Sequence, residues 1–146
     1  MSQPVKFTDV ERTAAMLDAL RRARTIERAG AESAIVLTEV PAMAGYGTTI
    51  ADALVLNIWQ SAGRSRATRS FRRLDGYELK ASRSDLKREL ARPDKGEGVR
   101  KFCDTWSLVA FDEKVYSGLD IPGDWGLYEL REHDLVRVRT APLRTG

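Results

Sequence analysis

Cysteine and histidine are nearly absent from this sequence. Its 146 residues include one cysteine, Cys103, and one histidine, His133. A single cysteine excludes an intrachain disulfide and fits a reducing compartment, so we expect a cytoplasmic location. No histidine stands near Cys103 in the sequence, and we interpret this cysteine as a core residue rather than a nucleophile. We also find no zinc-finger spacing and no clear helix-turn-helix pattern.

Long apolar runs are missing too. No apolar stretch reaches about 18 residues, and the N-terminal sequence MSQPVKFTDVER has no apolar signal-peptide core. We therefore expect neither a membrane span nor a signal peptide. Repeats, low-complexity tracts and linkers are likewise lacking. With 42% hydrophobic and 31% charged residues, the chain is typical of one folded domain over residues 1–146, with residues 1–7 as a loose arm.

The net charge of +3 permits an anionic partner without requiring one. The basic residues gather in the segment GRSRATRSFRR, which has no acidic residue between Gly63 and Leu74. Its arginines are Arg64, Arg66, Arg69, Arg72 and Arg73. The guanidinium fork suits phosphate, so this segment could follow a DNA backbone and add affinity without base preference. The alternative is an ordinary solvated loop.

Hydrophobic spacing predicts one helix and then three strands in the first half of the chain. The helix runs from about Thr8 to Ala29, because Thr8 and Glu11 form a capping-box pattern and Gly30 is a natural stop. The strands are expected at 34–40, 50–59 and 71–82, joined by a Gly-containing loop at 41–49 and a polar turn at 60–70. Gly76 is a candidate β-bulge in the third strand.

The second half reads as a helix broken near Pro93, followed by three more strands. Leu86 and Leu90 should face the core before the break. After it, the apolar stripe is Val99, Phe102, Cys103 and Trp106. The late strands are expected at 107–111, 126–130 and 135–140. The predicted order αβββαβββ gives a single α/β domain with a mixed central β-sheet flanked by helices.

Three charged residues sit inside apolar strands. Asp52 is the only charge in IADALVLNIW, and the stretch YELKAS places Glu78 and Lys80 two residues apart, on one face of a strand. Two converging carboxylates suit a divalent cation such as Mg²⁺, and a lysine with a depressed pKa could orient or deprotonate the attacking water. The alternatives are an ion pair of Glu78 with Lys80 on an edge strand, and Asp52 as a turn cap.

This order of a strand Asp, a strand Glu-x-Lys and a helix resembles the core of the PD-(D/E)XK nuclease superfamily. The stretch ELKASRSDLKRELARPDKGEGVRKFCDTWSLVA and the segment IPGDWGLYEL are similar to a small phage and bacterial subgroup that includes the MmcB-like DNA-repair proteins. The match covers roughly residues 35–130. No proline precedes Asp52, which is a departure from the superfamily pattern. The resemblance implies a restriction-endonuclease-like core, αβββαβ.

The resemblance also implies roles for particular residues. Asp52 and Glu78 would hold Mg²⁺ or Mn²⁺, the backbone carbonyl of Leu79 would complete the metal shell, and Lys80 would be the catalytic lysine. An extra glutamate is frequent in such sites; Glu39 is preferred here over Glu11 and Glu27. The helix after the motif often adds a polar residue, for which Lys87 and Lys95 are candidates.

The function expected from this resemblance is metal-dependent hydrolysis of DNA in repair, recombination or phage genome processing. Two alternatives stay open. One is a catalytically inactive nucleic-acid-binding or protein-interaction module on the same fold. The other is a nuclease subunit that needs a helicase or recombination partner, or a second protomer in a homodimer.

Overall fold

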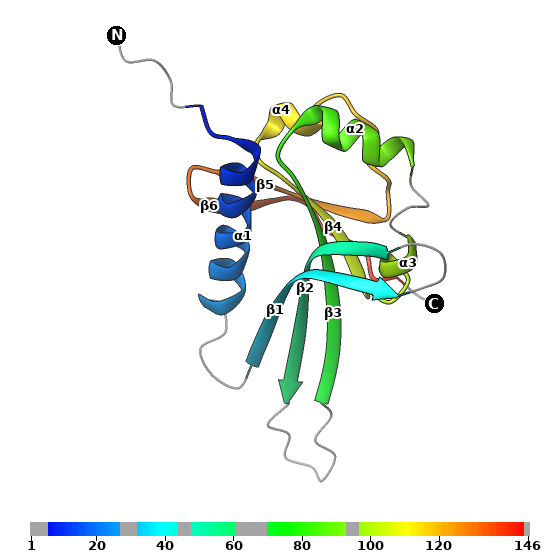
Figure 1. The fold of residues 1–146 in the computed structure, drawn as a ribbon. Helices are drawn as coiled ribbons and strands as arrows, with labels where there is room; N and C mark the ends of the chain where they lie inside the picture. The colour runs from blue at the N-terminus through cyan, green and yellow to red at the C-terminus, as the bar shows by residue number, and fades with distance from the viewer. Residues whose placement is uncertain (1–5, 27–31, 44–47, 61–69, 93–96, 145–146) are drawn as a thin grey trace.

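The computed structural model describes residues 6–26, 32–43, 48–60, 70–92 and 97–144. These residues form a six-stranded mixed β-sheet with helices on both faces (Figure 1). The helices are α1 (Asp9–Ile26), α2 (Arg83–Ala91), α3 (Glu97–Arg100) and α4 (Glu113–Tyr116). The strands are β1 (Glu32–Met43), β2 (Thr48–Gln60), β3 (Ser70–Lys80), β4 (Thr105–Ala110), β5 (Trp125–Arg131) and β6 (Asp134–Arg139). The expectation of an α/β domain with a mixed sheet is thus confirmed.

The strands lie in the sheet in the order of the sequence, β1-β2-β3-β4-β5-β6. The first three form an antiparallel meander. Strands β3, β4 and β5 are parallel to one another, because α2 with α3, and then α4, return the chain to the same edge. Strand β6 closes the sheet antiparallel to β5. No helix in the described part of the chain is long and apolar enough to cross a bilayer.

The predicted capping box fixes the start of α1. The Thr8 backbone N–H and hydroxyl both donate to Glu11 Oε1, and Thr8 Oγ1 accepts a hydrogen bond from the Glu11 N–H. The described helix ends at Ile26, and residues 27–31 lie outside the described part. Phe7 belongs to no loose arm, because its ring lies 6.4 Å from that of Phe111.

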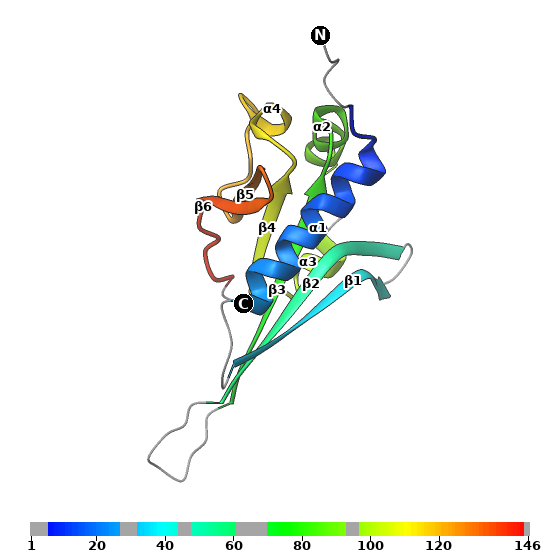
Figure 2. The same ribbon diagram turned by 90° about the vertical axis from the view of Figure 1, so that its left-hand side faces the viewer.

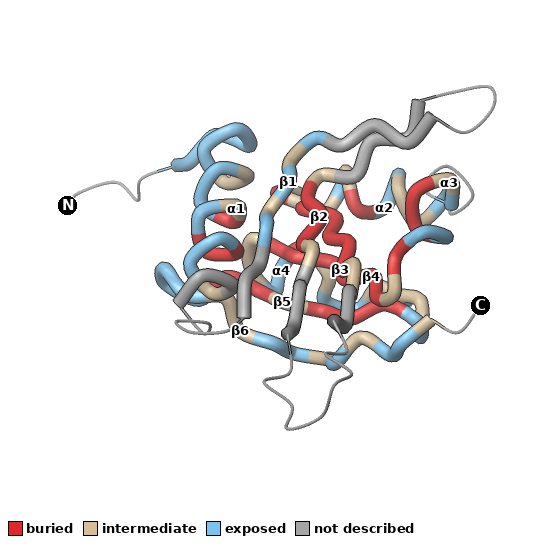
Figure 3. Tube along the Cα trace, turned by 90° about the horizontal axis from the view of Figure 1, so that it is seen from below, coloured by how far each residue is buried: buried red, intermediate tan, exposed pale blue. Residues whose placement is uncertain are grey.

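Two apolar clusters cover the sheet, one on each face. Helix α1 runs along one face (Figure 2), and buried residues are concentrated in the strands and on the helices that pack on them (Figure 3). Successive residues of β3 point to opposite faces of the sheet, so they pack alternately in one cluster and in the other. Tyr77 and Leu79 pack toward α1, on Met16 and Leu20. The residues of the opposite face lie under α2, α3 and α4, and Asp52, Leu54, Glu78 and Lys80 belong to that face by strand alternation and register.

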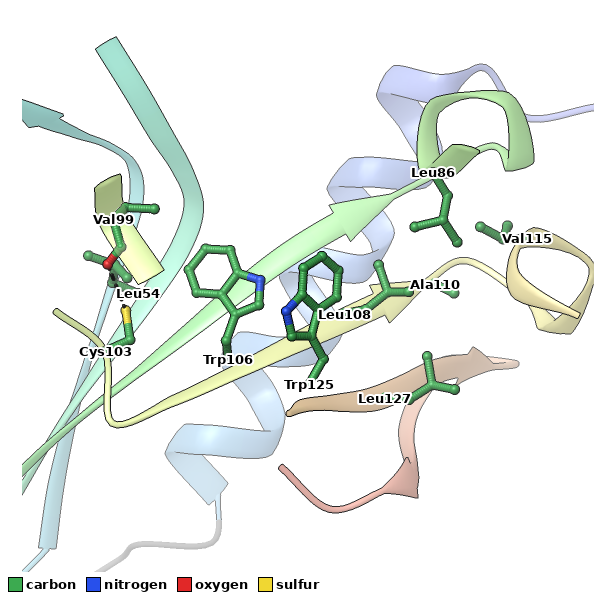
Figure 4. Packing of buried hydrophobic residues seen from close by; sticks show 10 residues of the cluster. All are labelled: Leu54, Leu86, Val99, Cys103, Trp106, Leu108, Ala110, Val115, Trp125 and Leu127. Carbon is green, nitrogen blue, oxygen red and sulfur yellow. Dashed lines mark hydrogen bonds between the residues drawn. The ribbon is translucent and has the colours of Figure 1, made fainter. Parts of the chain in front are cut away.

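Trp106 and Trp125 form the centre of the second cluster (Figure 4). Both are buried and act as packing residues. The guanidinium carbon of Arg100 lies 5.7 Å from the ring centroid of Trp106 and 5.1 Å from that of Trp125. Cys103 is buried in the same cluster, which confirms its place in the core.

Two local predictions are wrong, and one helix was missed. Gly76 makes no bulge, since the pairing of β3 with both neighbours runs through it without a shift. A side chain there would collide with the ring of Trp106, so glycine is needed for close packing. Phe102 is 63% exposed, because α3 is one short turn that ends at Arg100. Helix α4 was not predicted; the Asp112 side chain caps it by accepting from the Lys114 N–H.

Candidate active site

The register of β2 and β3 places Asp52 next to Glu78. The last paired residues of the two strands are Ala53 and Tyr77, so the next positions in register are Asp52 and Glu78. The ladder ends there, and Asp52 Oδ2 accepts a hydrogen bond from the Leu79 N–H at 2.9 Å. The Asp52 side chain thus accepts the Leu79 backbone N–H just beyond the point where backbone pairing between β2 and β3 ends. This position in β2 contradicts the alternative in which Asp52 caps a turn.

Glu78 and Lys80 form an ion pair beside Asp52. Lys80 Nζ lies 3.1 Å from Glu78 Oε1, and both side chains are mostly buried, with 14% and 11% exposed. Strand β3 lies between β2 and β4, so the pair stands on a central strand rather than on an edge strand. Burying three charged groups here is expensive unless each has a partner.

A fourth charged residue completes the cluster from α2. Glu89 Oε2 lies 3.6 Å from Lys80 Nζ, with 16% of its side chain exposed. We did not predict Glu89, but its spacing carries a signal. It comes three residues after Leu86 and directly before Leu90, both of which pack on the core, so it lies on the sheet-facing side of the helix. Lys87, the residue predicted from this helix, is exposed instead.

Burial keeps the two strand carboxylates from ionising easily. Burial raises the pKa of Glu78 to about 8, and the nearby Asp52 carboxylate adds to the effect against the attraction of Lys80. Burial also raises the pKa of Asp52, although the Leu79 hydrogen bond and the charge of Lys80 lower it. A cation bound between these two groups would remove the penalty that both now carry.

The electrostatic setting of Lys80 differs from the one predicted. Burial alone would lower the pKa of its ammonium group, but the carboxylates of Glu78 and Glu89 outweigh it and raise that pKa above its ordinary value. Lys80 therefore carries its proton at neutral pH in this arrangement. It is suited to donate hydrogen bonds and to offset negative charge, and the role of a proton-accepting lysine is not supported.

Of the glutamates considered as an extra ligand, Glu39 lies beside Asp52 in register. It stands on β1 opposite Asp52 on the neighbouring strand β2, between the pairs Thr38–Ala53 and Val40–Ala51; it is exposed and has a φ of 50°, which is strained backbone for a residue with a side chain. The described carboxylates nevertheless do not gather into a group of three that could hold a metal ion. Glu11 caps α1 on the other face. Glu27 lies outside the described residues, as does Lys95.

The arginine segment leads away from the candidate site. Residues 61–69, with Arg64, Arg66 and Arg69, lie outside the described part, and only the backbone of Arg72 is described. Arg73 donates to Asp75 at 2.8 Å on the face that packs against α1. The start of β3 at Ser70 is ten residues from Lys80, or about 30 Å along an extended strand. Of these arginines, the structure describes the side chain of Arg73 alone, and it lies on the face of the sheet opposite to Asp52 and Glu78.

Comparisons with known proteins reveal one likeness in structure. A solved structure, described as the SPO1766 protein of unknown function from Silicibacter pomeroyi, has a TM-score of 0.58 and 18% sequence identity, over 97% of this chain and 77% of that one. At this identity the likeness shows a shared fold and nothing further. No protein-family model matches the sequence, and no curated protein matches it.

Proposed function

We propose that this protein is a metal-dependent nuclease that hydrolyses DNA, and that Asp52, Glu78 and Lys80 carry the reaction. One observation supports this most directly. The buried carboxylate of Glu78 and the partly buried carboxylate of Asp52, from neighbouring strands, lie together on one face of the sheet, beside a lysine that stays protonated. The element order α1-β1-β2-β3-α2-α3-β4 also fits the restriction-endonuclease-like core αβββαβ that the sequence resemblance implies, with the short helix α3 as an addition.

The donor set fits Mg²⁺ or Mn²⁺. Within the described residues no group of three or more His, Cys, Asp or Glu is placed to hold a metal ion. Magnesium needs fewer, because it commonly takes one or two protein carboxylates and fills its other positions with water and phosphate oxygens. Asp52 and Glu78 would hold the ion. The Leu79 carbonyl faces the β2 side together with its N–H, as in any strand, and would be the third protein ligand.

Bound metal would supply a Lewis acid that neutralises phosphate charge and acidifies water. The protein's own groups have separate tasks. The carboxylates of Asp52 and Glu78 fix the position of the cation relative to the sheet. The ammonium group of Lys80 donates hydrogen bonds toward the attacking water or the phosphate oxygens and offsets charge that grows on them. Glu89 keeps Lys80 protonated and in place.

A cleavage assay tests this proposal. Labelled single-stranded, duplex and branched DNA would be incubated with the protein in Mg²⁺, Mn²⁺ or EDTA, beside Lys80→Ala and the exposed-lysine control Lys87→Ala. We expect metal-dependent cleavage that Lys80→Ala abolishes and Lys87→Ala retains. Full activity in Lys80→Ala would refute the role assigned to this lysine. Cleavage in EDTA would refute the metal dependence.

An inactive binding or interaction module remains the rival, because the ion pairs of Lys80 with Glu78 and Glu89 already satisfy the cluster without metal. Such a module would bind nucleic acid in a salt-dependent and metal-independent way. If Mg²⁺ raises the melting temperature of the wild type and not of Asp52→Asn, the rival fails, because only a ligand of the native state stabilises it. The cytoplasmic location, the homodimer and the helicase or recombination partner stay predictions.

A further inference from the structure

A cavity of about 460 Å³ opens along α2, next to the buried lysine of the candidate site. It is lined by Lys80, Asp85, Arg88, Glu89, Ala91 and Arg92. Lys80 reaches from this cavity to Glu78, since its Nζ lies 3.1 Å from the Glu78 carboxylate. A molecule that enters the cavity therefore comes within reach of the same ammonium group that stands beside the proposed metal ligands.

The wall of this cavity carries more positive charge than negative charge. Of its two carboxylates, Glu89 is paired with Lys80 and Asp85 with Arg88. Arg88 is 77% exposed at its side chain, and Arg92 is also exposed. Among the described residues, no ion pair is recorded for Arg92. The described lining groups of the cavity thus carry a net charge of one positive unit, and two of them are exposed guanidinium groups.

We propose that this cavity is a binding site for a backbone phosphate of a DNA substrate, one that neighbours the phosphate being cleaved, and that Arg88 and Arg92 are its ligands. The inference rests on the proposed function and names the substrate contact of the same site. Residues four apart on a helix lie side by side, so Arg88 and Arg92 can engage one phosphate or two adjacent ones. Arginine suits this task because its planar fork donates two parallel hydrogen bonds to phosphate oxygens.

The position of the cavity separates it from the arginine-rich segment predicted to bind DNA. That segment continues from the start of β3, about 30 Å from Lys80, whereas Arg88 and Arg92 belong to the helix that follows Lys80 directly. The α2 arginines line the cavity that also holds Lys80, so they stand close enough to hold a phosphate beside the reacting one. Contacts of this kind position the backbone and read no sequence.

The test compares Arg88→Gln, Arg92→Gln and the double variant with Arg137→Gln, which removes an exposed arginine from β6. The probe is a short fluorescein-labelled DNA single strand, or its duplex, titrated in EDTA at several salt concentrations. We expect about tenfold weaker binding for each α2 variant, the cost of one hydrogen bond to a charged group. The slope of log affinity against log salt should fall by about 0.7–0.9 per arginine. Arg137→Gln should match the wild type.

Charge-retaining variants separate phosphate contact from a structural effect. Arg88→Lys and Arg92→Lys should restore most of the salt slope and part of the affinity. Both arginines are exposed, so the melting temperature of every variant should stay that of the wild type. Unchanged affinity and slope in the double variant would overturn the proposal, and so would a wild type that binds no DNA at all.

The nuclease proposal and the phosphate-site proposal can fail independently of each other. If the wild type binds DNA through Arg88 and Arg92 but cleaves no substrate in Mg²⁺ or Mn²⁺, the phosphate site stands and the nuclease fails. If the wild type cleaves DNA and the double variant keeps the same KM and kcat, the nuclease stands and the phosphate site is refuted. A raised KM with unchanged kcat in the double variant supports both.

Discussion

Asp52 and Leu79 are joined across β2 and β3 by a side-chain bond where the backbone ladder ends. The Asp52 carboxylate accepts the Leu79 N–H at 2.9 Å, one position beyond the last ladder pair. This bond holds the carboxylate beside Glu78 and leaves its second oxygen available for another partner. The geometry of the candidate site therefore depends on a contact between one side chain and the backbone of the neighbouring strand.

Asp52→Asn and Asp52→Ala should have different effects on stability and the same effect on activity. Asparagine can still accept the Leu79 N–H and removes a buried negative charge, so its free energy of unfolding should equal or exceed that of the wild type. Alanine leaves the N–H without its acceptor, which costs about 1–3 kcal/mol. Both should abolish cleavage. Urea unfolding and the cleavage assay check this; equal stability of the two variants would show that the bond contributes nothing.

The raised pKa of Glu78 predicts a pH-dependent loss of stability. Burial and the neighbouring Asp52 raise this pKa from its ordinary 4.5 to about 8 in the folded protein. The folded state then binds the proton more tightly than the unfolded state does. The contribution to stability is complete below about pH 4.5 and is lost as the pH rises through about 8, in total on the order of 5 kcal/mol.

Urea unfolding of the wild type and Glu78→Gln in EDTA would measure that loss. Glutamine cannot ionise, so the variant should gain in stability relative to the wild type between about pH 4.5 and pH 8, and the difference should level off above that. Glu132→Gln, an exposed change in the turn after β5, serves as the control and should follow the wild type. A constant difference between Glu78→Gln and the wild type across this range would mean that Glu78 ionises normally in the folded state.

The strands and the position of the three charges were predictable because they depend on local patterns. Apolar runs mark β2 and β3, and the two-residue period puts Glu78 and Lys80 on one face. The features that the sequence patterns did not predict depend on contacts between residues far apart in the chain. The role of Gly76 depends on Trp106, which is 30 positions away in the sequence, and the burial of Glu89 depends on how α2 settles on β3. The pKa of Lys80 depends on that same docking, so its direction could not be read from the motif.

Gly76→Ala should destabilise the protein by about 1–3 kcal/mol, the usual cost of overpacking a core. A Cβ at this position would lie 2.8 Å from Cys103 Sγ and closer still to the ring of Trp106, which is fully buried and has little room to move. Chemical denaturation would measure the loss. Gly123→Ala is the matched control, since a Cβ there meets nothing within 4 Å. Equal stability of the two variants would show that Trp106 shifts without cost.

Glu89→Gln should lower kcat about tenfold with little change in KM, because Lys80 loses one of the two carboxylates that hold it. It should also shift the whole pH–rate profile toward acid. The negative charge of Glu89 raises the pKa of Asp52, Glu78 and Lys80 alike, so its removal lowers all three. Glu113→Gln, an exposed change on α4, should leave both kcat and the profile unaltered. A lower kcat with an unshifted pH–rate profile would show that Glu89 acts only through packing. A normal kcat would show that Glu89 has no part in the reaction.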